Sequence, residues 1–342
     1  MFKDLPLWSN LALLAAAAAA VWWGGAGLAR HADALARKTG LDQALLGMLL
    51  LGGVTSLPEL AVAVTATLND APLLTLNDIL GSASINVVIL ALADARYGRG
   101  ALTATPGHPQ VLLQGTLSVV LLLLVAAAVV SGDRLFWGMG AWSWVLLGSY
   151  ALAVRLVATS NRMHSWVPDP QGAQHDDPPE SDAPKASRAQ LIGRIALRGG
   201  VILVAGFVLA QSAEGFAEQS GLGNSFVGAV LLGLCTSLPE VSTVLAAVKL
   251  GRYEMAIGDV FGTNLFNMNI LVLVDAIHGG PPVLSAAGAF GTFAAMLAAL
   301  LTLLYVVGVI ERRDRTVLRM GTDSLAVLAV YAAGVAMLYR LR

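Results

Sequence analysis

Apolar and polar positions follow one another in long blocks along this chain. Apolar stretches near twenty residues, the length that an α-helix needs to cross a bilayer, are separated by short polar segments. The pattern predicts an all-α integral membrane protein with ten transmembrane helices. We place these helices at residues 8–30, 41–68, 72–95, 108–131, 135–158, 189–216, 221–249, 253–278, 283–310 and 318–340.

Composition narrows the class of protein further. Of the 342 residues, 56% are hydrophobic and 13% are charged, and the mean hydropathy is +0.72. These values indicate a membrane protein and argue against a soluble enzyme. The alanine run at residues 15–20 resembles the core of a signal peptide, but the apolar stretch continues to Leu28, so we expect the first helix to be retained. The single cysteine, Cys235, excludes an intrachain disulfide framework.

One five-residue sequence, Thr-Ser-Leu-Pro-Glu, occurs at residues 55–59 and again at 236–240, each time within an apolar stretch. A shift of 181 positions superposes the two copies without a gap. Over residues 47–94 and 228–275, 17 of the 48 aligned positions are identical. A match of this length indicates an internal duplication of a structural unit.

The duplication predicts the organisation of the chain. We expect a first five-helix repeat at residues 1–158 and a second at 189–342, joined by a proline-rich segment at 159–188 that is typical of a disordered cytoplasmic linker. Because five is an odd number, the second repeat would cross the membrane in the opposite sense. Such inverted repeats occur in secondary transporters, where broken helices meet at the bilayer midplane. Pro58 and Pro239 place the predicted breaks in helices 2 and 7.

Basic residues are distributed unevenly between the two sides of the predicted membrane. The loops after the first, third, fifth, seventh and ninth helices contain 17 of the 21 Lys and Arg residues. Loops rich in Lys and Arg stay in the cytoplasm. We therefore expect a multi-pass protein of the cell (inner) membrane with both termini on the extracytoplasmic side.

The duplicated segment also contains the candidate chemistry. A carboxylate near the bilayer centre costs roughly 2.5 to 3.5 kcal/mol, so each glutamate of the motif needs a partner or a function. Polar residues four positions apart in helices 3 and 8 share one helix face and extend the cluster. Oxygen ligands without histidine suit a hard cation such as calcium or sodium. The candidate metal ligands are Glu59, Glu240, Thr55, Ser56, Ser82, Asn86, Thr236, Ser237, Thr263 and Asn267.

Four further aspartates are related by the same shift. Asp78 and Asp259 precede the glycines of helices 3 and 8 by three residues. They either attract cations into the site or cap the starts of these helices, and we favour capping. Asp94 and Asp275 lie near the ends of the same helices, where we favour an interfacial position.

These motifs resemble the cation/calcium exchanger family, and within it the sodium/calcium exchanger branch. Both halves carry its Thr-Ser-x-Pro-Glu signature, followed by Gly-Ser/Thr-x-x-x-Asn at residues 81–86 and 262–267. The resemblance implies a ten-helix exchanger in which Glu59 and Glu240 coordinate calcium. It also implies that hydroxyl groups help to hold sodium, namely those of Thr55, Ser56, Ser82, Thr236, Ser237 and Thr263.

This chain departs from the family pattern at three places. Asn267 stands where many prokaryotic relatives have an aspartate, so the core holds two carboxylates from the motif set. Ala83 replaces the asparagine expected from Asn264 of the second repeat. The short linker lacks the large regulatory calcium-binding domains of animal exchangers.

The expected function is secondary active exchange of sodium for calcium by alternating access. One calcium ion or two sodium ions would neutralise two ionised glutamates, and three sodium ions would leave one positive charge. The alternative is a calcium/proton antiporter, since clustered carboxylates release calcium when they are protonated. We expect no enzyme activity, because no zinc-protease or serine-nucleophile motif is present. We expect the lipid bilayer around the chain, and no cofactor, nucleic acid or obligatory protein partner.

Overall fold

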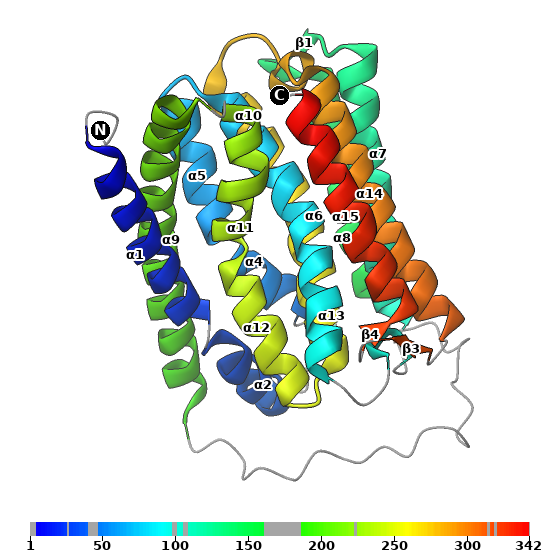
Figure 1. The fold of residues 1–342 in the computed structure, drawn as a ribbon. Helices are drawn as coiled ribbons and strands as arrows, with labels where there is room; N and C mark the ends of the chain where they lie inside the picture. Colours follow the sequence, from blue (N-terminus) through cyan, green and yellow to red (C-terminus); the bar gives the residue numbers. More distant parts are fainter. Residues whose placement is uncertain are drawn as a thin grey trace.

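The computed structural model describes residues 5–25, 27–39, 47–97, 101–104, 109–160, 186–221, 224–312, 315–317 and 320–341. Long α-helices form one bundle in which most helices run lengthwise (Figure 1). Within the described residues, eight helices are long and apolar enough to cross a membrane, and a bent pair makes a ninth candidate. A shorter apolar helical segment at Gly52–Leu68 also contributes to the bundle. The chain is a multi-pass membrane protein.

The first half of the chain contains two helices before a broken segment and three long helices after it. In order these are α1 (Leu7–Gly25), α2 (Leu28–Thr39), the π-helical turn η1 (Gly47–Leu51), α4 (Gly52–Thr55), α5 (Leu57–Leu68), α6 (Pro72–Tyr97), the 3₁₀ turn η2 (Leu102–Ala104), α7 (Pro109–Ser131), strands β1 (Leu135–Phe136) and β2 (Met139–Gly140), and α8 (Ala141–Ser160).

The second half repeats this series, except that one helix, α9, spans the positions equivalent to both α1 and α2. Its elements are α9 (Arg188–Ser220), α10 (Asn224–Phe226), the π-helical turn η3 (Val227–Leu232), α11 (Gly233–Thr236), α12 (Leu238–Lys249), α13 (Tyr253–His278), the 3₁₀ turn η4 (Val283–Ala286), α14 (Gly288–Glu311), strands β3 (Thr316–Val317) and β4 (Met320–Gly321), and α15 (Thr322–Leu341). The shift of 181 positions that superposes the motifs also carries β1 onto β3 and α8 onto α15.

Both motif helices are broken inside the Thr-Ser-Leu-Pro-Glu sequence. α4 ends at Thr55 and α5 begins at Leu57, with proline in the first turn of the new helix. The second copy repeats this geometry, and its two segments meet at a bend of 44°. Proline is tolerated there because the first N–H groups of a helix have no partner inside the helix. The predicted breaks are thus present in both halves.

Several predicted helix ends differ from the structure. Residues 135–140, placed in the fifth span, form a two-strand hairpin in which Trp137 and Gly138 have positive φ, as a tight hairpin turn requires. Residues 283–286 form a 3₁₀ turn before α14, and residues 320–321 belong to the second hairpin. The first span, predicted to reach residue 30, ends at Gly25, and a separate amphipathic helix follows. The predicted linker is largely at 161–185, outside the described residues.

Each first helix of a repeat packs against the broken helix of the other repeat. α1 contacts α12, and α9 contacts α5. At these crossings a Cβ atom added to Gly25 would lie 2.7 Å from the Cα of Pro239, and one added to Gly206 would lie 2.6 Å from the Cα of Pro58. Only glycine permits so close an approach of two backbones. The two contacts are equivalent under the shift of 181 positions, so the same close approach of backbones occurs twice.

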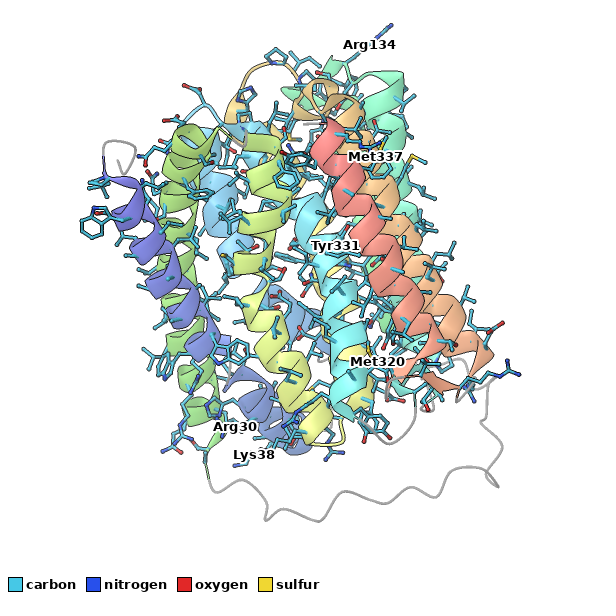
Figure 2. The ribbon with its side chains drawn as sticks, in the orientation of Figure 1. Arg30, Lys38, Arg134, Met320, Tyr331 and Met337 are labelled. Carbon is cyan, nitrogen blue, oxygen red and sulfur yellow. The ribbon has the colours of Figure 1, made fainter. Side chains whose placement is uncertain are left out.

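The equivalent hairpins lie at opposite ends of the bundle. β1 is at the upper end in Figure 1, whereas β3 and β4 are at the lower end, and both chain termini are at the upper end. Arg30 and Lys38 lie at the lower end and Arg134 at the upper end (Figure 2).

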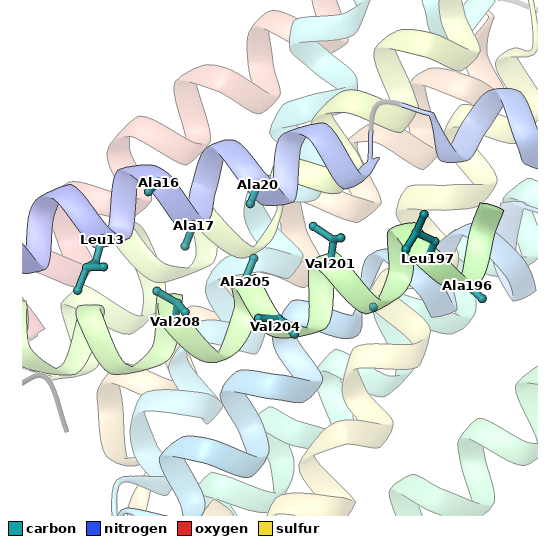
Figure 3. Close-up of a pocket in the computed structure, with 11 residues that line it drawn as sticks. Leu13, Ala16, Ala17, Ala20, Ala196, Leu197, Val201, Val204, Ala205 and Val208 are labelled. Carbon is teal, nitrogen blue, oxygen red and sulfur yellow. The ribbon is translucent and has the colours of Figure 1, made fainter. Parts of the chain in front are cut away.

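An open apolar groove of about 680 Å³ lies between α1 and α9. Figure 3 shows small side chains such as Ala16, Ala17 and Ala20 on one wall and Val201 and Val204 on the other. None of the polar candidate residues lines this groove. It is therefore separate from the polar centre of the bundle.

Candidate functional site

The structure buries all ten predicted ligands completely. The broken helices carry six of them, and the long helices α6 and α13 carry the other four. The fully buried set comprises Thr55, Ser56, Glu59, Ser82, Asn86, Thr236, Ser237, Glu240, Thr263 and Asn267.

Glu59 and Glu240 occupy the first turns of α5 and α12. Their side chains lie within electrostatic range of each other. The positive end of a helix dipole stabilises an ionised carboxylate in this position. Among the described residues, none of the four carboxylate oxygens accepts a hydrogen bond. Hydroxyl groups lie nearby, that of Thr236 beside Glu59 and those of Thr55 and Thr263 beside Glu240. Both carboxylates therefore have lone pairs available to a cation.

Most of the motif hydroxyls donate to their own helix. Thr55 Oγ1 lies 3.0 Å from the Leu51 carbonyl, and Ser56 Oγ donates to the Gly52 carbonyl at 2.7 Å. A hydroxyl that gives its hydrogen to a backbone carbonyl keeps its oxygen lone pairs. This common helical contact is thus compatible with binding a cation. Ser237 Oγ has no hydrogen-bond partner among the described residues.

One of the two motif hydroxyls in the long helices shows the same pattern. Ser82 Oγ donates to the Ile79 carbonyl at 3.1 Å within α6. Across the two halves, Thr55 Oγ1 and Thr263 Oγ1 are 3.2 Å apart, and Asn267 Nδ2 lies 3.4 Å from Ser82 Oγ. The broken helix of the first repeat therefore meets α13 of the second.

Glycines bring these elements together. A Cβ atom added to Gly52 would lie 2.8 Å from the backbone nitrogen of Thr263, and one added to Gly233 would lie 3.0 Å from that of Ser82. The broken helix of each repeat thus lies directly against the Gly-Ser/Thr turn of the long helix in the other repeat. The site is built at the contact between the repeats.

Asn264 connects the two long helices and was not among the predicted ligands. Its Nδ2 donates to the Ala83 carbonyl at 3.1 Å, and its Oδ1 accepts from Asn86 Nδ2 at 2.9 Å. The amide oxygens of Asn86 and Asn267 have no hydrogen-bond partner among the described residues. The difference between Ala83 and Asn264 was the only sequence signal that set this position apart.

The favoured capping role of Asp78 and Asp259 is wrong. Both lie well inside α6 and α13, and both are fully buried. Asp78 accepts a hydrogen bond from Thr236 Oγ1 at 3.1 Å, and Asp259 Oδ1 lies 3.5 Å from Thr55 Oγ1. Each aspartate therefore contacts the motif threonine of the other repeat. Sequence alone does not reveal this, because the contact depends on how the repeats pack.

Asp94 and Asp275 lie near the ends of α6 and α13 and are also buried. Asp94 accepts backbone N–H groups of Leu102 and Gly321. Asp275 accepts those of Val283 and Gly140 and also the hydroxyl of Ser143. These aspartates stabilise the turns and hairpins at the ends of the long helices. No described contact connects them with the glutamates.

The chemistry of the donor set suits hard cations. The candidate residues supply carboxylate, hydroxyl and amide oxygens, and no group of three or more His, Cys, Asp or Glu side chains in the described residues shares one metal-sized site. The chain has one cysteine, Cys235, which lies in α11. Such oxygen-rich sets favour calcium or sodium over zinc or copper.

A duplicated helical membrane protein with two buried glutamates at helix breaks belongs to the class of secondary cation transporters. Comparison with known proteins identifies the family. The family model described as sodium/calcium exchanger protein matches residues 9–158 and 191–340. The chain belongs to this family.

Three individual relatives share a quarter or less of their aligned residues with this chain. The chain is 25% identical over 275 residues to the putative antiporter CaxA of Alkalimonas amylolytica, covering 80% of this chain and 82% of the relative. It is 25% identical over 247 residues to the inner membrane protein YrbG of Escherichia coli (strain K12), covering 72% and 73%. The solved structure of the sodium-calcium exchanger NCX_Mj superposes with a TM-score of 0.67 at 16% identity, covering 97% of this chain and 99% of that one. The fold is thus shared.

Proposed function

We propose that the protein is a secondary active antiporter that exchanges sodium for calcium across the membrane by alternating access. The observation that carries the proposal is the pair of buried glutamates, Glu59 and Glu240, at two symmetric helix breaks. Membership of the sodium/calcium exchanger protein family supports the antiporter class. The ten predicted ligands would form the ion-binding core, with calcium held by the glutamates and sodium held largely by the hydroxyl groups.

The proposed arrangement has ten transmembrane helices in two inverted five-helix repeats, at residues 1–158 and 189–342. The bent pair α11–α12 and the shorter segment α4–α5 would supply the broken helices 7 and 2, which meet at the midplane. Both termini would be extracytoplasmic in a cell (inner) membrane. The position of Arg30 and Lys38 at the end opposite the termini supports this orientation (Figure 2).

Charge supplies a reason for coupling. An empty core with two ionised glutamates has a net charge of −2 in a medium of low dielectric constant, so a change of access would be costly. One calcium ion removes this charge. Three sodium ions would exceed the charge of the two glutamates by +1, and each exchange of three sodium ions for one calcium ion moves one net charge whatever the charge of the neighbouring aspartates. We propose that only a loaded core changes access.

The test is calcium-45 efflux from proteoliposomes with sodium, potassium, acid or choline outside. Sodium-specific efflux supports the proposal, and protein-free liposomes give the background. Efflux into a medium that lacks both sodium and calcium would contradict the obligatory coupling, because an unloaded core would then have to return.

Calcium/proton exchange is the second candidate. The observation that favours it is the presence of two further buried carboxylates, Asp78 and Asp259, close to the glutamates. A pH jump without sodium discriminates between the two functions. Calcium efflux driven by external acid alone, with no response to sodium, would establish proton exchange in place of sodium exchange.

A further inference from the structure

Asp78 and Asp259 are equivalent in the two repeats but differ in their hydrogen bonds. Asp259 Oδ1 lies near Thr55 Oγ1, and its Oδ2 accepts the hydroxyl of Thr243. Asp78 Oδ1 accepts the hydroxyl of Thr236, but its Oδ2 has no hydrogen-bond partner among the described residues. One carboxylate is therefore satisfied at both oxygens and the other at only one.

One sequence difference between the repeats accompanies this difference in hydrogen bonding. The shift of 181 positions carries Val62 onto Thr243, and Val62 is fully buried in α5. Valine has nearly the shape of threonine but cannot donate a hydrogen bond. In the second repeat, the Thr243 hydroxyl donates to Asp259. The first repeat has no equivalent hydroxyl at position 62. A buried carboxylate oxygen without a donor is costly unless a cation or a proton neutralises it.

The oxygen without a donor lies beside the proposed ion core. Asp78 is within electrostatic range of Glu59 and touches Thr236, whose neighbour Ser237 also has an oxygen without a partner among the described residues. Asp259 stands in the same relation to Glu240. Three carboxylates do not share one metal-sized site anywhere in the described residues. An ion at Asp78 would thus be distinct from an ion held between the two glutamates.

We propose that Asp78 ligates a sodium ion on the first-repeat side of the core, together with Glu59 and the hydroxyl oxygens of Thr236 and Ser237. Asp259 instead positions Thr55 and Thr243 and ligates no ion. This inference rests on the proposed sodium/calcium exchange.

Charge and geometry favour sodium at this position. A divalent ion between Glu59 and Glu240 uses the charge of both glutamates, so the flank that contains Asp78 is left to a second, separate ion. Two carboxylates and two hydroxyls are hard oxygen ligands, which suit sodium. Because calcium alone takes the central position, loss of the Asp78 carboxylate should affect the sodium-loaded state more than the calcium-loaded state.

The experiment measures two quantities in proteoliposomes of the full chain. The first is the external sodium concentration that gives half-maximal calcium-45 efflux. The second is calcium-calcium exchange without sodium, which reports on folding and on the central site. Asp78→Asn keeps the shape of the side chain and removes its charge. We expect its half-saturating sodium concentration to rise at least about tenfold, a change of about 1.4 kcal/mol, and calcium-calcium exchange, which also depends on the neighbouring Glu59, to weaken clearly less than sodium-driven efflux.

A pair of further variants tests the role of Asp78 Oδ2 without altering a charge. Val62→Thr introduces the missing donor, which would compete with sodium for Asp78 Oδ2. We expect half-saturation by sodium to rise about threefold, or about 0.6 kcal/mol. The reverse change, Thr243→Val, makes the opposite exchange of a hydroxyl and a methyl group in the second repeat. It should not raise the half-saturating sodium concentration. This pair keeps the inference testable if Asp78→Asn does not fold.

Three results would overturn the inference. Wild-type sodium dependence in both Asp78→Asn and Val62→Thr would show that Asp78 binds no sodium. Equal weakening of sodium-driven and calcium-calcium exchange in Asp78→Asn would place the aspartate in the calcium site. Unchanged sodium dependence with loss of acid-driven calcium efflux would show that Asp78 carries a proton. Absence of sodium-driven efflux in the unmodified protein is a different result, because it overturns the proposed function and this inference with it.

Discussion

The two halves of this protein share a backbone but differ in side-chain chemistry. From η1 to α8, every element of the first half has a counterpart displaced by 181 positions, and α9 spans the positions equivalent to both α1 and α2. The close glycine contacts are also paired, Gly52 with Gly233 and Gly25 with Gly206. Yet the residues at equivalent positions can differ. Val62 of the first repeat corresponds to Thr243 of the second, and Ala83 corresponds to Asn264. The duplication preserves the backbone frame, and single substitutions distinguish the ligand environments.

The comparison suggests which features must be symmetric. Contacts between backbones recur in both halves because the broken helices can meet the long helices only where no Cβ intervenes. Hydrogen bonds to ligand oxygens need not recur, because an ion in an asymmetric core contacts each repeat differently. We therefore expect substitutions in the shared frame to act alike in both halves and substitutions at the unequal positions to act differently.

Removing the charge of either glutamate should have the largest effect. Glu59→Gln and Glu240→Gln each remove one member of a buried charge set, which costs about 3 kcal/mol or more and reduces calcium binding more than about a hundredfold. Similar losses are expected if both bind one central calcium ion. Calcium-45 uptake and isothermal titration with calcium measure the effect. A variant that keeps full calcium exchange would remove that glutamate from the central site.

The glycine contacts provide a test of the shared frame. Gly52→Ala should destabilise the fold by about 1 to 3 kcal/mol, since its added methyl group meets the backbone of Thr263. Gly233→Ala should act similarly. Gly53→Ala is the matched control, because nothing lies within 4 Å of its added Cβ atom. Thermal unfolding in detergent measures all three, and equal melting temperatures for Gly52→Ala and Gly53→Ala would contradict the close approach.

Asn264 tests an unequal position. Asn264→Ala gives the second repeat the residue that the first repeat has and removes the bonds to Asn86 and to the Ala83 carbonyl. A net loss of about 1 to 2 kcal/mol is expected for two buried hydrogen bonds. Melting temperature and calcium half-saturation should both change. The converse variant, Ala83→Asn, does not restore these bonds, so a double variant that recovers fully would argue against this account.

The hairpin contacts should differ slightly between the halves. Asp275 accepts three hydrogen bonds, including one from Ser143, whereas Asp94 accepts two described ones. The counterpart of Ser143 is Ser324, which is buried with no partner for its hydroxyl among the described residues. Asp275→Asn should therefore lower stability by about 1 kcal/mol more than Asp94→Asn. Ser143→Ala measures the extra bond, and chemical unfolding that ranks Asp94→Asn lower would reverse the comparison.

The smallest expected effect concerns acidity. Asn267 has no titratable proton, so we expect sodium/calcium exchange to depend less on pH than in a relative with aspartate there. Asn267→Asp introduces a group whose protonation would compete with cations, so exchange should weaken as the pH falls. Calcium-45 efflux from pH 5 to 8 measures this change. An unchanged profile in Asn267→Asp would contradict the expected protonation at this position.

Much of the fold could be predicted because hydrophobicity and duplication are both encoded in order along the chain. Apolar length located the long helices, and proline located both breaks. The hairpin at residues 135–140 was missed because its side chains, such as Leu135 and Trp137, are as apolar as those of a membrane helix. The separation of α1 from α2 was missed for a related reason, since its glycines also fit a continuous helix.

The candidate site was less predictable than the fold. Each of the ten proposed ligands is buried, and the motif itself brings a carboxylate, hydroxyls and a helix break into one turn. The aspartates at positions 78 and 259 were misread because capping is a local explanation and their contacts are not local. Thr236 lies 158 residues from Asp78 in the sequence. No periodic pattern specifies such a pairing, which arises only when the repeats cross.

The crossed hairpin contacts also have a consequence for the order of synthesis. Asp94 accepts an N–H group from Gly321, 227 residues later in the chain. At translation rates of 5 to 20 residues per second, roughly 10 to 45 seconds pass before that donor is made. Asp275 finds Gly140 already synthesised. The Asp94 contact can therefore form only after the second repeat has been synthesised, whereas the donor to Asp275 already exists in the first repeat. The contacts at the end of the first repeat thus depend on completion of the second.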